Sequence, residues 1–518
     1  MAHSMLNLDR IMKPEPKSLA GRRVLVVGLG RFGGGVGVTR WLASQGATVT
    51  VTDQAARETL AESVAAVADV PVTLHLGGHD EGDLDAADLV IINPAVNKST
   101  SAFFQAIVRR GLSWTTEMNL FCERCPAKVL GVTGSYGKST TCAMLAEAME
   151  ACRRADKVSY TGVHLGGNIG RSLLNDLPNI RETDWVVLEM SNAQLEDLPR
   201  IHWAPDVAVI TNLFPHHLDR YARFEDYIGA KLNITRHPER YSKIVVGELH
   251  SLAEDLLEEA VADRRDRVIR VPLPDPAVEL RVPGHHNHLN AACALTACSL
   301  LGLNQAVVRS TLRDFRGLPH RLEFIRTLDG VDYYNDSKST APAATVTALE
   351  ALVSSPRPEP RASARAELHR KIIAIVGGQR KDVSRVECAI SLARYCRVVI
   401  GMGESGPDFA DAIKTLSSLP PLPSRERVGV RVDAIGSTAA SHSVPSEPPH
   451  SCGGFFVNMI VQVVAALPDA VRLAHAESRP GEVVLFSPGA PSFDQYANFT
   501  DRGRHFNELV QGLCGVVK

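Results

Sequence analysis

The sequence predicts a mixed α/β protein of several domains, each built on a mostly parallel sheet with helices on both faces. Its 518 residues exceed one ordinary domain and suggest about three. Short runs of Val, Ile and Leu without polar alternation recur along the chain, which is typical of strands buried on both faces. Helix-patterned segments, such as 140–150 and 290–301, lie between these runs. This alternation indicates doubly wound sheets.

The residues that directly follow each expected strand are candidates for ligand binding, because doubly wound sheets bind ligands beyond the carboxyl ends of their strands. A further pair of strands is expected at 322–326 and 331–334. The buried strands are 23–27, 47–52, 89–92, 129–132, 185–188, 207–210, 372–376, 398–400 and 483–486.

Composition and charge exclude several classes of protein. Lys and Arg number 56 and Asp and Glu 58, so the net charge of −2 gives no footprint for nucleic-acid binding. No apolar run reaches the length of a membrane span, and the N-terminus has no signal-peptide pattern. Ten cysteines are too few for a disulfide scaffold, and the close pair Cys122 and Cys125 has no second pair to complete a zinc site. We therefore expect a cytoplasmic protein that binds neither nucleic acid nor membrane.

Three domains are expected, at residues 1–125, 126–318 and 319–518. Two Pro-, Ser- and Arg-rich insertions, 354–366 and 415–452, cannot bury enough apolar area to order themselves and are predicted to be mobile.

A glycine-rich loop follows the first strand. Gly28, Gly30 and Gly33 allow a tight turn whose N–H groups approach a pyrophosphate at a helix N-terminus. Asp53 closes the next strand, where such folds place a carboxylate that contacts a ribose or base. The pattern indicates a dinucleotide or a nucleotide-sugar diphosphate, with NAD as the default.

A variant P-loop opens the second domain. Residues 134–140 read GSYGKST between a strand and a helix, so that backbone N–H groups can hold phosphate and Lys138 can reach the β- and γ-phosphates. The strict pattern requires Gly at position 132, which is Val; Gly131 stands one residue earlier. An ATP site is predicted, and a chain with both loops is poorly explained as a dehydrogenase.

Three further candidates follow strand ends. Glu189 ends the strand 185–188, His217 lies in the loop after 207–211, and Lys231 comes 14 residues later. A carboxylate and an imidazole beside ATP are reasonable groups for a magnesium site.

Taken together, these motifs resemble those of the Mur ligases, and most closely those of the branch that adds D-glutamate. The resemblance covers nearly the whole length apart from the two insertions. Its markers, in order, are the first glycine-rich loop, 134–140, 166–170 (GGNIG), 188–195 (LEMSNAQL), 217–220 (HLDR), 230–232 (AKL), 286–290 (HNHLN), 317–321 (GLPHR), 335–338 (NDSK), 377–381 (GGQRK) and 487–499 (SPGAPSFDQYANF).

The resemblance implies a Rossmann-like first domain, a P-loop ATPase core and a Rossmann-like third domain. It implies a monomer that uses ATP and Mg²⁺ to join D-glutamate to UDP-N-acetylmuramoyl-L-alanine through an acyl phosphate. Domain closure would bring the amino-acid site to the reaction. The UDP-linked substrate would contact Gly28, Gly30, Asp53, Asn168, Ser191 and Gln194.

The other site residues are also implied by the resemblance. Lys231 would be carbamylated, because an ammonium repels magnesium whereas a carbamate offers oxygens. The metal set would be Ser139, Glu189, His217 and the modified Lys231, and the catalytic set Lys138, Glu189, His217, Lys231 and Lys338. ATP would contact Gly134, Ser135, Tyr136, Gly137, Lys138, Ser139, Thr140, Asn287, Asn290, Arg321 and Asp336. D-Glutamate would contact Thr340, Lys381, Ser492 and Phe499.

The sequence departs from the family pattern at two places and leaves other functions open. Residues 93–95 are Asn-Pro-Ala where the family has Ser-Pro-Gly, and residues 191–194 read SNAQ where it has SSFQ. The alternatives are a sister ligase or a folylpolyglutamate synthase-like enzyme that adds another amino acid, a nicotinamide-dependent oxidoreductase, and a nucleotide-gated binding protein without catalysis.

Overall fold

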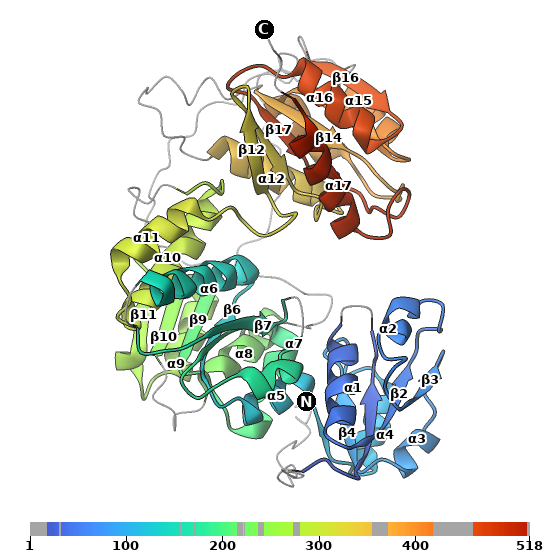
Figure 1. The fold of residues 1–518 in the computed structure, drawn as a ribbon, viewed down its shortest axis with the longest axis vertical. Coiled ribbons are helices and arrows are strands. Elements are labelled where there is room, and N and C mark those ends of the chain that lie inside the picture. The colour runs from blue at the N-terminus through green and yellow to red at the C-terminus, as the bar shows by residue number, and fades with distance from the viewer. Residues whose placement is uncertain are drawn as a thin grey trace, which may run out of the picture. The chain divides into compact units, whose positions relative to one another are not determined.

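A computed structural model describes most of the chain and confirms the α/β class. The described residues are 18–30, 33–155, 158–169, 172–214, 221, 223–236, 243–272, 280–354, 371–417 and 459–514. They contain three separate sheets, each with helices packed on it, which Figure 1 traces in colour along the chain. The chain divides into two compact units, Met1–Leu280 with His286–Phe315, and Arg281–His285 with Arg316–Lys518. The boundaries of the three expected domains stay a prediction.

The first sheet is parallel, with the order β3-β2-β1-β4-β5. Side chains on β1 alternate between two cores: Val24 and Val26 pack with helix α1, whereas Leu25 and Val27 pack with helix α4. Both faces are therefore covered, as the unbroken apolar run predicts. The elements are β1 Arg23–Val27, α1 Gly34–Ser44, β2 Thr48–Asp53, α2 Ala61–Ala65, β3 Val72–Leu76, α3 Gly82–Asp85, β4 Leu89–Ile92, α4 Ala102–Arg109, β5 Trp114–Thr115 and α5 Glu117–Arg124.

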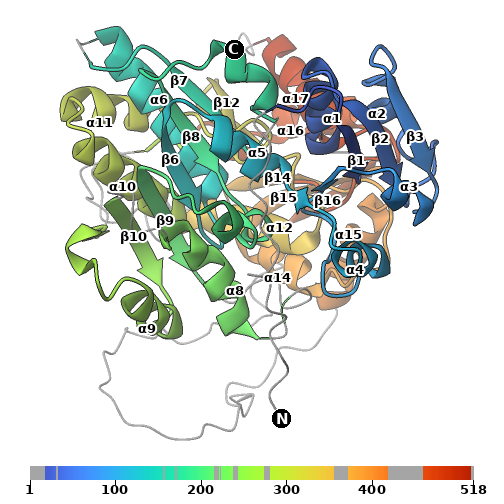
Figure 2. The ribbon, with the colours of Figure 1, turned by 90° about the horizontal axis from the view of Figure 1, so that it is seen from below.

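The second sheet is also parallel, with the order β11-β10-β9-β6-β8-β7. Helices α6, α10 and α11 lie on one face and α8 and α9 on the other (Figures 1 and 2). The elements are β6 Lys128–Thr133, α6 Lys138–Ala155, β7 Val163–Gly167, β8 Trp185–Glu189, α7 Asn192–Leu195, β9 Val207–Leu213, α8 Phe224–Leu232, β10 Lys243–Leu249, α9 Ser251–Ala260, β11 Val268–Arg270, α10 His285–Leu300 and α11 Gln305–Asp314. Short 3₁₀ turns cover Leu174–Asn179, Leu198–Ile201, Asn233–Thr235 and Arg265–Arg267.

The third sheet has the order β12-β13-β17-β14-β15-β16, and only the edge pair β12 and β13 is antiparallel. Its two faces carry separate cores, one with α12, α14 and α15 and one with α16 and α17. The elements are β12 Glu323–Leu328, β13 Val331–Asn335, α12 Pro342–Ser354, β14 Ile372–Val376, α14 Val386–Tyr395, β15 Cys396–Met402, α15 Gly406–Ser417, β16 Ile460–Val464, α16 Leu467–Glu477, β17 Val483–Phe486 and α17 Phe499–Gly512.

All nine expected buried strands are present, with ends displaced by up to three residues, and the expected pair forms β12 and β13. Strands β3, β5, β7, β10, β11 and β16 were not expected. Five of them are edge strands and β10 is next to one, and β3 is half-buried with alternating exposure. Apart from their ends, the two insertions lie outside the described residues, so their predicted mobility stays a prediction.

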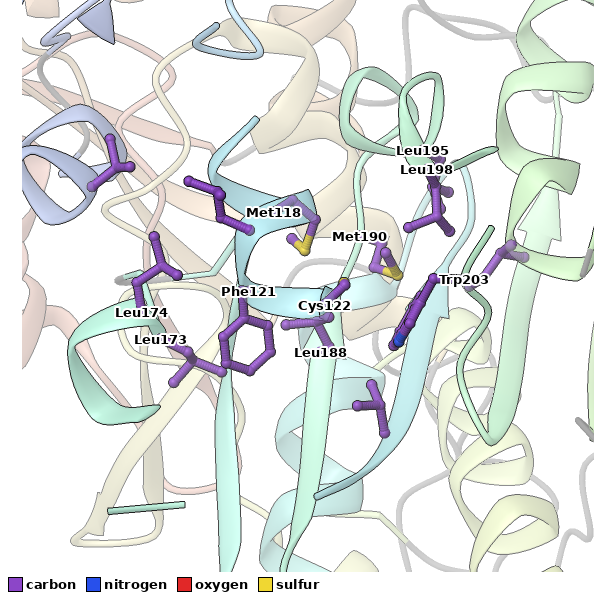
Figure 3. Close-up of a cluster of buried hydrophobic side chains, with 14 of the residues drawn as sticks. Met118, Phe121, Cys122, Leu173, Leu174, Leu188, Met190, Leu195, Leu198 and Trp203 are labelled. Atoms are coloured by element: carbon purple, nitrogen blue, oxygen red, sulfur yellow. The ribbon is translucent and has the colours of Figure 1, made fainter. Parts of the chain in front are cut away.

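One apolar cluster joins helix α5, the turn Leu174–Asn179, β8 and α7 within the first unit. Phe121 of α5 is buried beside Leu173 and Leu174, and Met190 lies between Met118 and Trp203 (Figure 3). None of the helices among the described residues is long and apolar enough to span a bilayer.

This cluster predicts a large effect for one phenylalanine. Phe121→Ala should lower the stability of the first unit by about 3–5 kcal/mol, because it removes a fully buried ring and leaves a cavity. Phe493→Ala is the matched control, since that ring is 61% exposed and its loss should cost less than about 0.5 kcal/mol. Thermal melting followed by circular dichroism compares the two, and equal shifts would contradict the buried role of Phe121.

Candidate active site

The glycine-rich loop after β1 has the geometry that the sequence predicts. Gly28 and Gly30 have φ of 98° and 63°, which favours glycine. A Cβ on Gly35, in the first turn of α1, would lie 2.2 Å from the Leu29 carbonyl, so this helix packs closely on the loop. Asp53, at the end of β2, accepts a hydrogen bond from the Gly30 N–H at 3.0 Å. The structure therefore brings the three predicted residues Gly28, Gly30 and Asp53 together.

Asn93 also belongs to this loop, and the sequence singled it out only as a departure from the family pattern. Its side-chain amide donates to the Gly28 carbonyl at 3.2 Å. A Cβ on Gly28 would lie 2.8 Å from the Asn93 Cβ, so the amide lies directly against the loop backbone. The position of Asn93 directly after β4, at the same sheet edge as Gly28, was the available signal.

Polar side chains from distant parts of the chain pack closely against the P-loop between β6 and α6. A Cβ on Gly137 would lie 2.0 Å from the Asn290 Oδ1, and a Cβ on Gly134 would lie 2.0 Å from the Thr211 Oγ1. Asn290 in turn donates to Asn287 at 3.3 Å, so the two predicted asparagines of α10 adjoin the P-loop. Lys138 donates to the Gly134 carbonyl at 2.9 Å.

Two residues at the end of β9 hydrogen-bond to the backbone of Tyr136 in the same loop. The sequence did not predict this contact. Asn212 accepts from the Tyr136 N–H at 2.9 Å and donates to the Tyr136 carbonyl at 3.1 Å. Thr211 donates to that carbonyl at 2.6 Å. A Thr-Asn pair after a buried strand beside a P-loop strand was the signal, since β6 and β9 are neighbours.

Glu189 ends β8 beside the P-loop strand and is tied to Asn168. The Asn168 side-chain amide donates to Glu189 Oε1 at 2.9 Å, and the backbone N–H of Asn168 donates to the Glu189 carbonyl at 2.9 Å. Glu189 is 2% exposed, and its Oε2 is buried with no hydrogen-bond partner in the described part of the chain. This buried carboxylate oxygen is a group that a hard cation would satisfy.

Lys231 of α8 is 1% exposed and contacts the P-loop. Its Nζ donates to the Gly134 carbonyl at 2.8 Å and lies 4.9 Å from the centre of the Tyr227 ring. Burial lowers the pKa of Lys231 well below its ordinary value, nearby Lys138 lowers it further, and Glu189 opposes them. Tyr227 donates to Ser135 at 2.9 Å, which links α8 to the P-loop again.

Ser191 and Gln194 satisfy each other's polar groups at the N-terminal end of the one-turn helix α7. Ser191 caps the helix by accepting from the Gln194 N–H at 3.4 Å, while the Gln194 Oε1 accepts from the Ser191 N–H at 2.9 Å. This reciprocal capping box follows from the sequence S-x-x-Q. It fixes both predicted substrate residues in one turn of backbone.

In the second unit, Asp336 lies at the centre of a buried polar group. Its Oδ1 accepts from the Leu322 N–H at 3.1 Å, and its Oδ2 accepts from Ser487 at 2.8 Å and from Ser339 at 2.5 Å. Burial is the largest influence and raises the pKa of Asp336 to about 6, although these hydrogen bonds oppose it.

Of the other predicted residues of this unit, Lys338, Thr340, Lys381 and Ser492 lie in segments that follow strands, whereas Arg321 precedes β12 and Phe499 begins α17. Lys338 is exposed and its Nζ lies 5.7 Å from the centre of the Phe499 ring. Thr340 and Lys381 are exposed, Arg321 is half-buried, and Ser492 is 2% exposed.

Arg502 is a buried residue of this unit that the sequence did not predict. It is fully buried and donates to the Ser337 carbonyl at 2.8 Å and to the Ala490 carbonyl at 3.0 Å. Arg502 therefore ties the loop after β13 to the loop after β17.

His217 lies outside the described residues, so its predicted role stays a prediction. Among the residues that are described, no group of three His, Cys, Asp or Glu side chains is arranged to hold a metal. The nine cysteines in the described residues are all free, and Cys122 lies in α5.

These loops define the class of the protein, a multi-domain α/β enzyme with a P-loop. Two family models match it: the Mur ligase MurD-like N-terminal domain at residues 22–113 and the Mur ligase middle domain at residues 132–272. The structure also resembles that of the UDP-N-acetylmuramate-alanine ligase of Thermotoga maritima, with a TM-score of 0.51, 20% identity and coverage of 95% of this chain and 99% of the other. At that identity the likeness shows the fold alone.

Two relatives match at nearly full length. The UDP-N-acetylmuramoylalanine--D-glutamate ligase of Symbiobacterium thermophilum is 32% identical, with coverage of 95% of this chain and 98% of the relative. The ligase of the same name from Roseiflexus sp. is also 32% identical, with coverage of 96% and 99%. The chain belongs to the Mur ligase family, whose members are ATP-dependent ligases.

The raised pKa of Asp336 predicts a pH-dependent contribution to stability. Between about pH 4 and pH 6 the folded protein keeps a proton that the unfolded chain has lost. The contribution of Asp336 to the free energy of unfolding should therefore fall by up to about 3 kcal/mol as the pH rises through this window. Asp336→Asn cannot titrate, so the stability of the wild type relative to this variant should fall over the same window. Urea unfolding at pH 4, 5, 6 and 7 measures it, and a constant difference between the two proteins would contradict the assignment.

Proposed function

We propose that this chain is the ligase that joins D-glutamate to UDP-N-acetylmuramoyl-L-alanine at the expense of ATP, in cytoplasmic peptidoglycan precursor synthesis. The observation that carries the proposal is the similarity to D-glutamate ligases over 95% of the chain, at 32% identity. The P-loop packed against Asn290 and the glycine-rich loop held by Asp53 supply a nucleotide site and a diphosphate site within the same unit.

In the proposed reaction, the alanyl carboxylate of the acceptor attacks the γ-phosphate of ATP and ADP leaves. The resulting acyl phosphate is needed because a carboxylate has no good leaving group. The D-glutamate amine then attacks the acyl carbon and loses a proton, and the tetrahedral intermediate collapses to the amide as phosphate departs. Lys138 and Lys338 would offset the negative charge that develops on the phosphate.

Magnesium fits the residues beside the P-loop. Glu189 offers a buried carboxylate oxygen that lacks a hydrogen-bond partner in the described residues, and Ser139 offers a hydroxyl at the start of α6. We assign Glu189, Ser139, His217 and a carbamylated Lys231 to the metal, which would supply positive charge at the transferring phosphate.

The remaining assignments follow the family pattern. Asn287, Asn290, Arg321 and Asp336 would contact ATP, together with the P-loop. The UDP-linked acceptor would lie against Gly28, Gly30, Asp53, Asn168, Ser191 and Gln194, and D-glutamate against Thr340, Lys381, Ser492 and Phe499. We propose that the enzyme acts as a monomer.

The test is phosphate release with ATP, UDP-N-acetylmuramoyl-L-alanine and a panel of D- and L-amino acids. D-Glutamate should be the only amino acid that supports rapid release, and release should require the acceptor. Lys138→Ala should abolish it by removing a cation at the phosphates, and circular dichroism checks that this variant is folded. A preference for another amino acid would indicate a sister ligase. Release that needs no acceptor, or oxidation of NADH, would contradict the proposal.

Lys231 supplies a separate prediction. Carbamate formation needs a neutral amine, and the burial that lowers the pKa of Lys231 favours that form. Lys231→Ala should therefore lose at least about 100-fold in turnover, because it deletes an oxygen donor from a catalytic site. Acetate should restore part of the activity by placing a carboxylate in the vacated space, whereas ethylamine should not. Full activity without any additive would exclude a role for Lys231, and rescue by the amine alone would indicate a cationic lysine.

A further inference from the structure

Helix α7 carries the proposed acceptor residues Ser191 and Gln194 but is only four residues long. One helical turn is not stable by itself in water, so its position depends on groups outside it. Two ties come from buried amides: Asn233 donates to the Leu195 carbonyl at 3.0 Å, and Asn119 donates to the Asp197 carbonyl at 2.8 Å. Figure 3 shows the apolar side of the same segment, where Leu195 and Leu198 lie near Trp203.

The charged tie is Lys98, which lies five residues after Asn93 in the segment that follows β4. Its Nζ donates to Glu196 Oε2 at 3.1 Å and lies 2.8 Å from Asp197 Oδ2. The Lys98 side chain is 16% exposed, Glu196 26% and Asp197 6%, so solvent screens this pair of contacts only partly.

The contacts continue from Lys98 to the second residue of the SNAQ segment. Tyr221 donates to Glu196 Oε1, the other oxygen of the carboxylate that Lys98 holds. The Asn192 amide donates to the Tyr221 hydroxyl at 2.7 Å. The Tyr221 ring packs edge-on against Tyr227 at 5.6 Å, which fixes the tyrosine from a second direction.

The two places where the sequence departs from the family pattern are therefore connected. Asn93 lies in the same loop as Lys98, and Asn192 is joined to Lys98 through Tyr221 and Glu196. Without Lys98, two adjacent carboxylates would face each other in a mostly buried place. Burial already raises the pKa of Asp197, and Lys98 is the strongest influence that opposes it.

We infer that Lys98 is a positioning residue for the acceptor substrate: through Glu196, Asp197 and Tyr221 it fixes helix α7 relative to the loop that follows β4. The inference rests on the proposed function, because it takes Ser191 and Gln194 as contacts of the acceptor. Lys98 itself touches no reacting group in this scheme. It acts by keeping the acceptor-binding turn in one place, so its loss should weaken acceptor binding and leave ATP binding unchanged.

The first experiment compares Lys98→Met with the wild type in the phosphate-release assay. The KM for UDP-N-acetylmuramoyl-L-alanine should rise about tenfold, equivalent to about 1.4 kcal/mol, while the KM for ATP stays within a factor of about two. Lys98→Arg should recover most of the loss, because it restores a cation within reach of Glu196 and Asp197. The matched control is Arg40→Met, which breaks the exposed ion pair with Asp69 in the same unit and should change neither KM.

A double-mutant cycle tests the route through Tyr221. Tyr221→Phe removes the hydroxyl that joins Asn192 to Glu196, so it should raise the KM for the acceptor in the same direction. Because Lys98 and Tyr221 act through the same Glu196 carboxylate, the combined variant should raise this KM by clearly less than the product of the two single effects.

Each outcome decides the inference. An unchanged acceptor KM in Lys98→Met would overturn it. Equal rises in both KM values with a lowered melting temperature would also overturn it, since they indicate a general structural role. Independent effects in the double variant would remove the route through Tyr221 and with it the inference. If the wild type itself shows no acceptor-dependent phosphate release, the proposed function fails, which the wild-type control reveals before any variant is compared.

Discussion

The backbone of the P-loop is the constraint on which the candidate site depends. Between β6 and α6 the chain passes so close to other elements that a Cβ on Gly134 or Gly137 would lie 2.0 Å from a side-chain oxygen. Asn290 of α10 packs against Gly137, and Thr211 at the end of β9 packs against Gly134. The loop therefore has its shape only when the second sheet and α10 are both in place. The predicted phosphate site is for this reason a property of the folded unit, not of the local sequence.

Two lysines donate to the same carbonyl of this loop, and their surroundings favour different protonation states. Lys138 and Lys231 both donate to the Gly134 carbonyl. Lys231 is buried and has Lys138 as a neighbouring cation, and both influences favour its neutral form. Two ammonium groups that share one acceptor repel each other, so a neutral or carbamylated Lys231 relieves a conflict that the fold creates.

Local patterns in the sequence account for much of this arrangement. Continuous apolar runs predicted the central strands of all three sheets, and the glycine spacing predicted the two glycine-rich loops, whose binding of phosphate stays a prediction. The same patterns could not predict β7 or β10, because β7 ends in two glycines and β10 carries charged residues near both ends. Nor could they reveal contacts between distant positions, such as Asn93 with Gly28, Thr211 with the P-loop, or Lys98 with Glu196. Those contacts depend on how the sheets place their loops, which no single segment encodes. His217 and the mobility of the two insertions stay predictions.

The close approaches at these glycines also limit which substitutions the sequence can accept. A Cβ on Gly167 would lie 2.3 Å from the Glu189 carbonyl oxygen, a backbone atom that cannot move aside. Gly134 and Gly137 have positive φ, a conformation that favours glycine. Residues beside these backbones are not subject to the same limit: Asn93 contacts the Gly28 carbonyl only through its side-chain amide, and Asn192 contacts Tyr221 in the same way. Variation among chains with this architecture can therefore accumulate around the phosphate-binding loops without entering them. In the proposed function, the acceptor contacts could then differ from one chain to another, beside a P-loop whose glycines leave little room for a side chain.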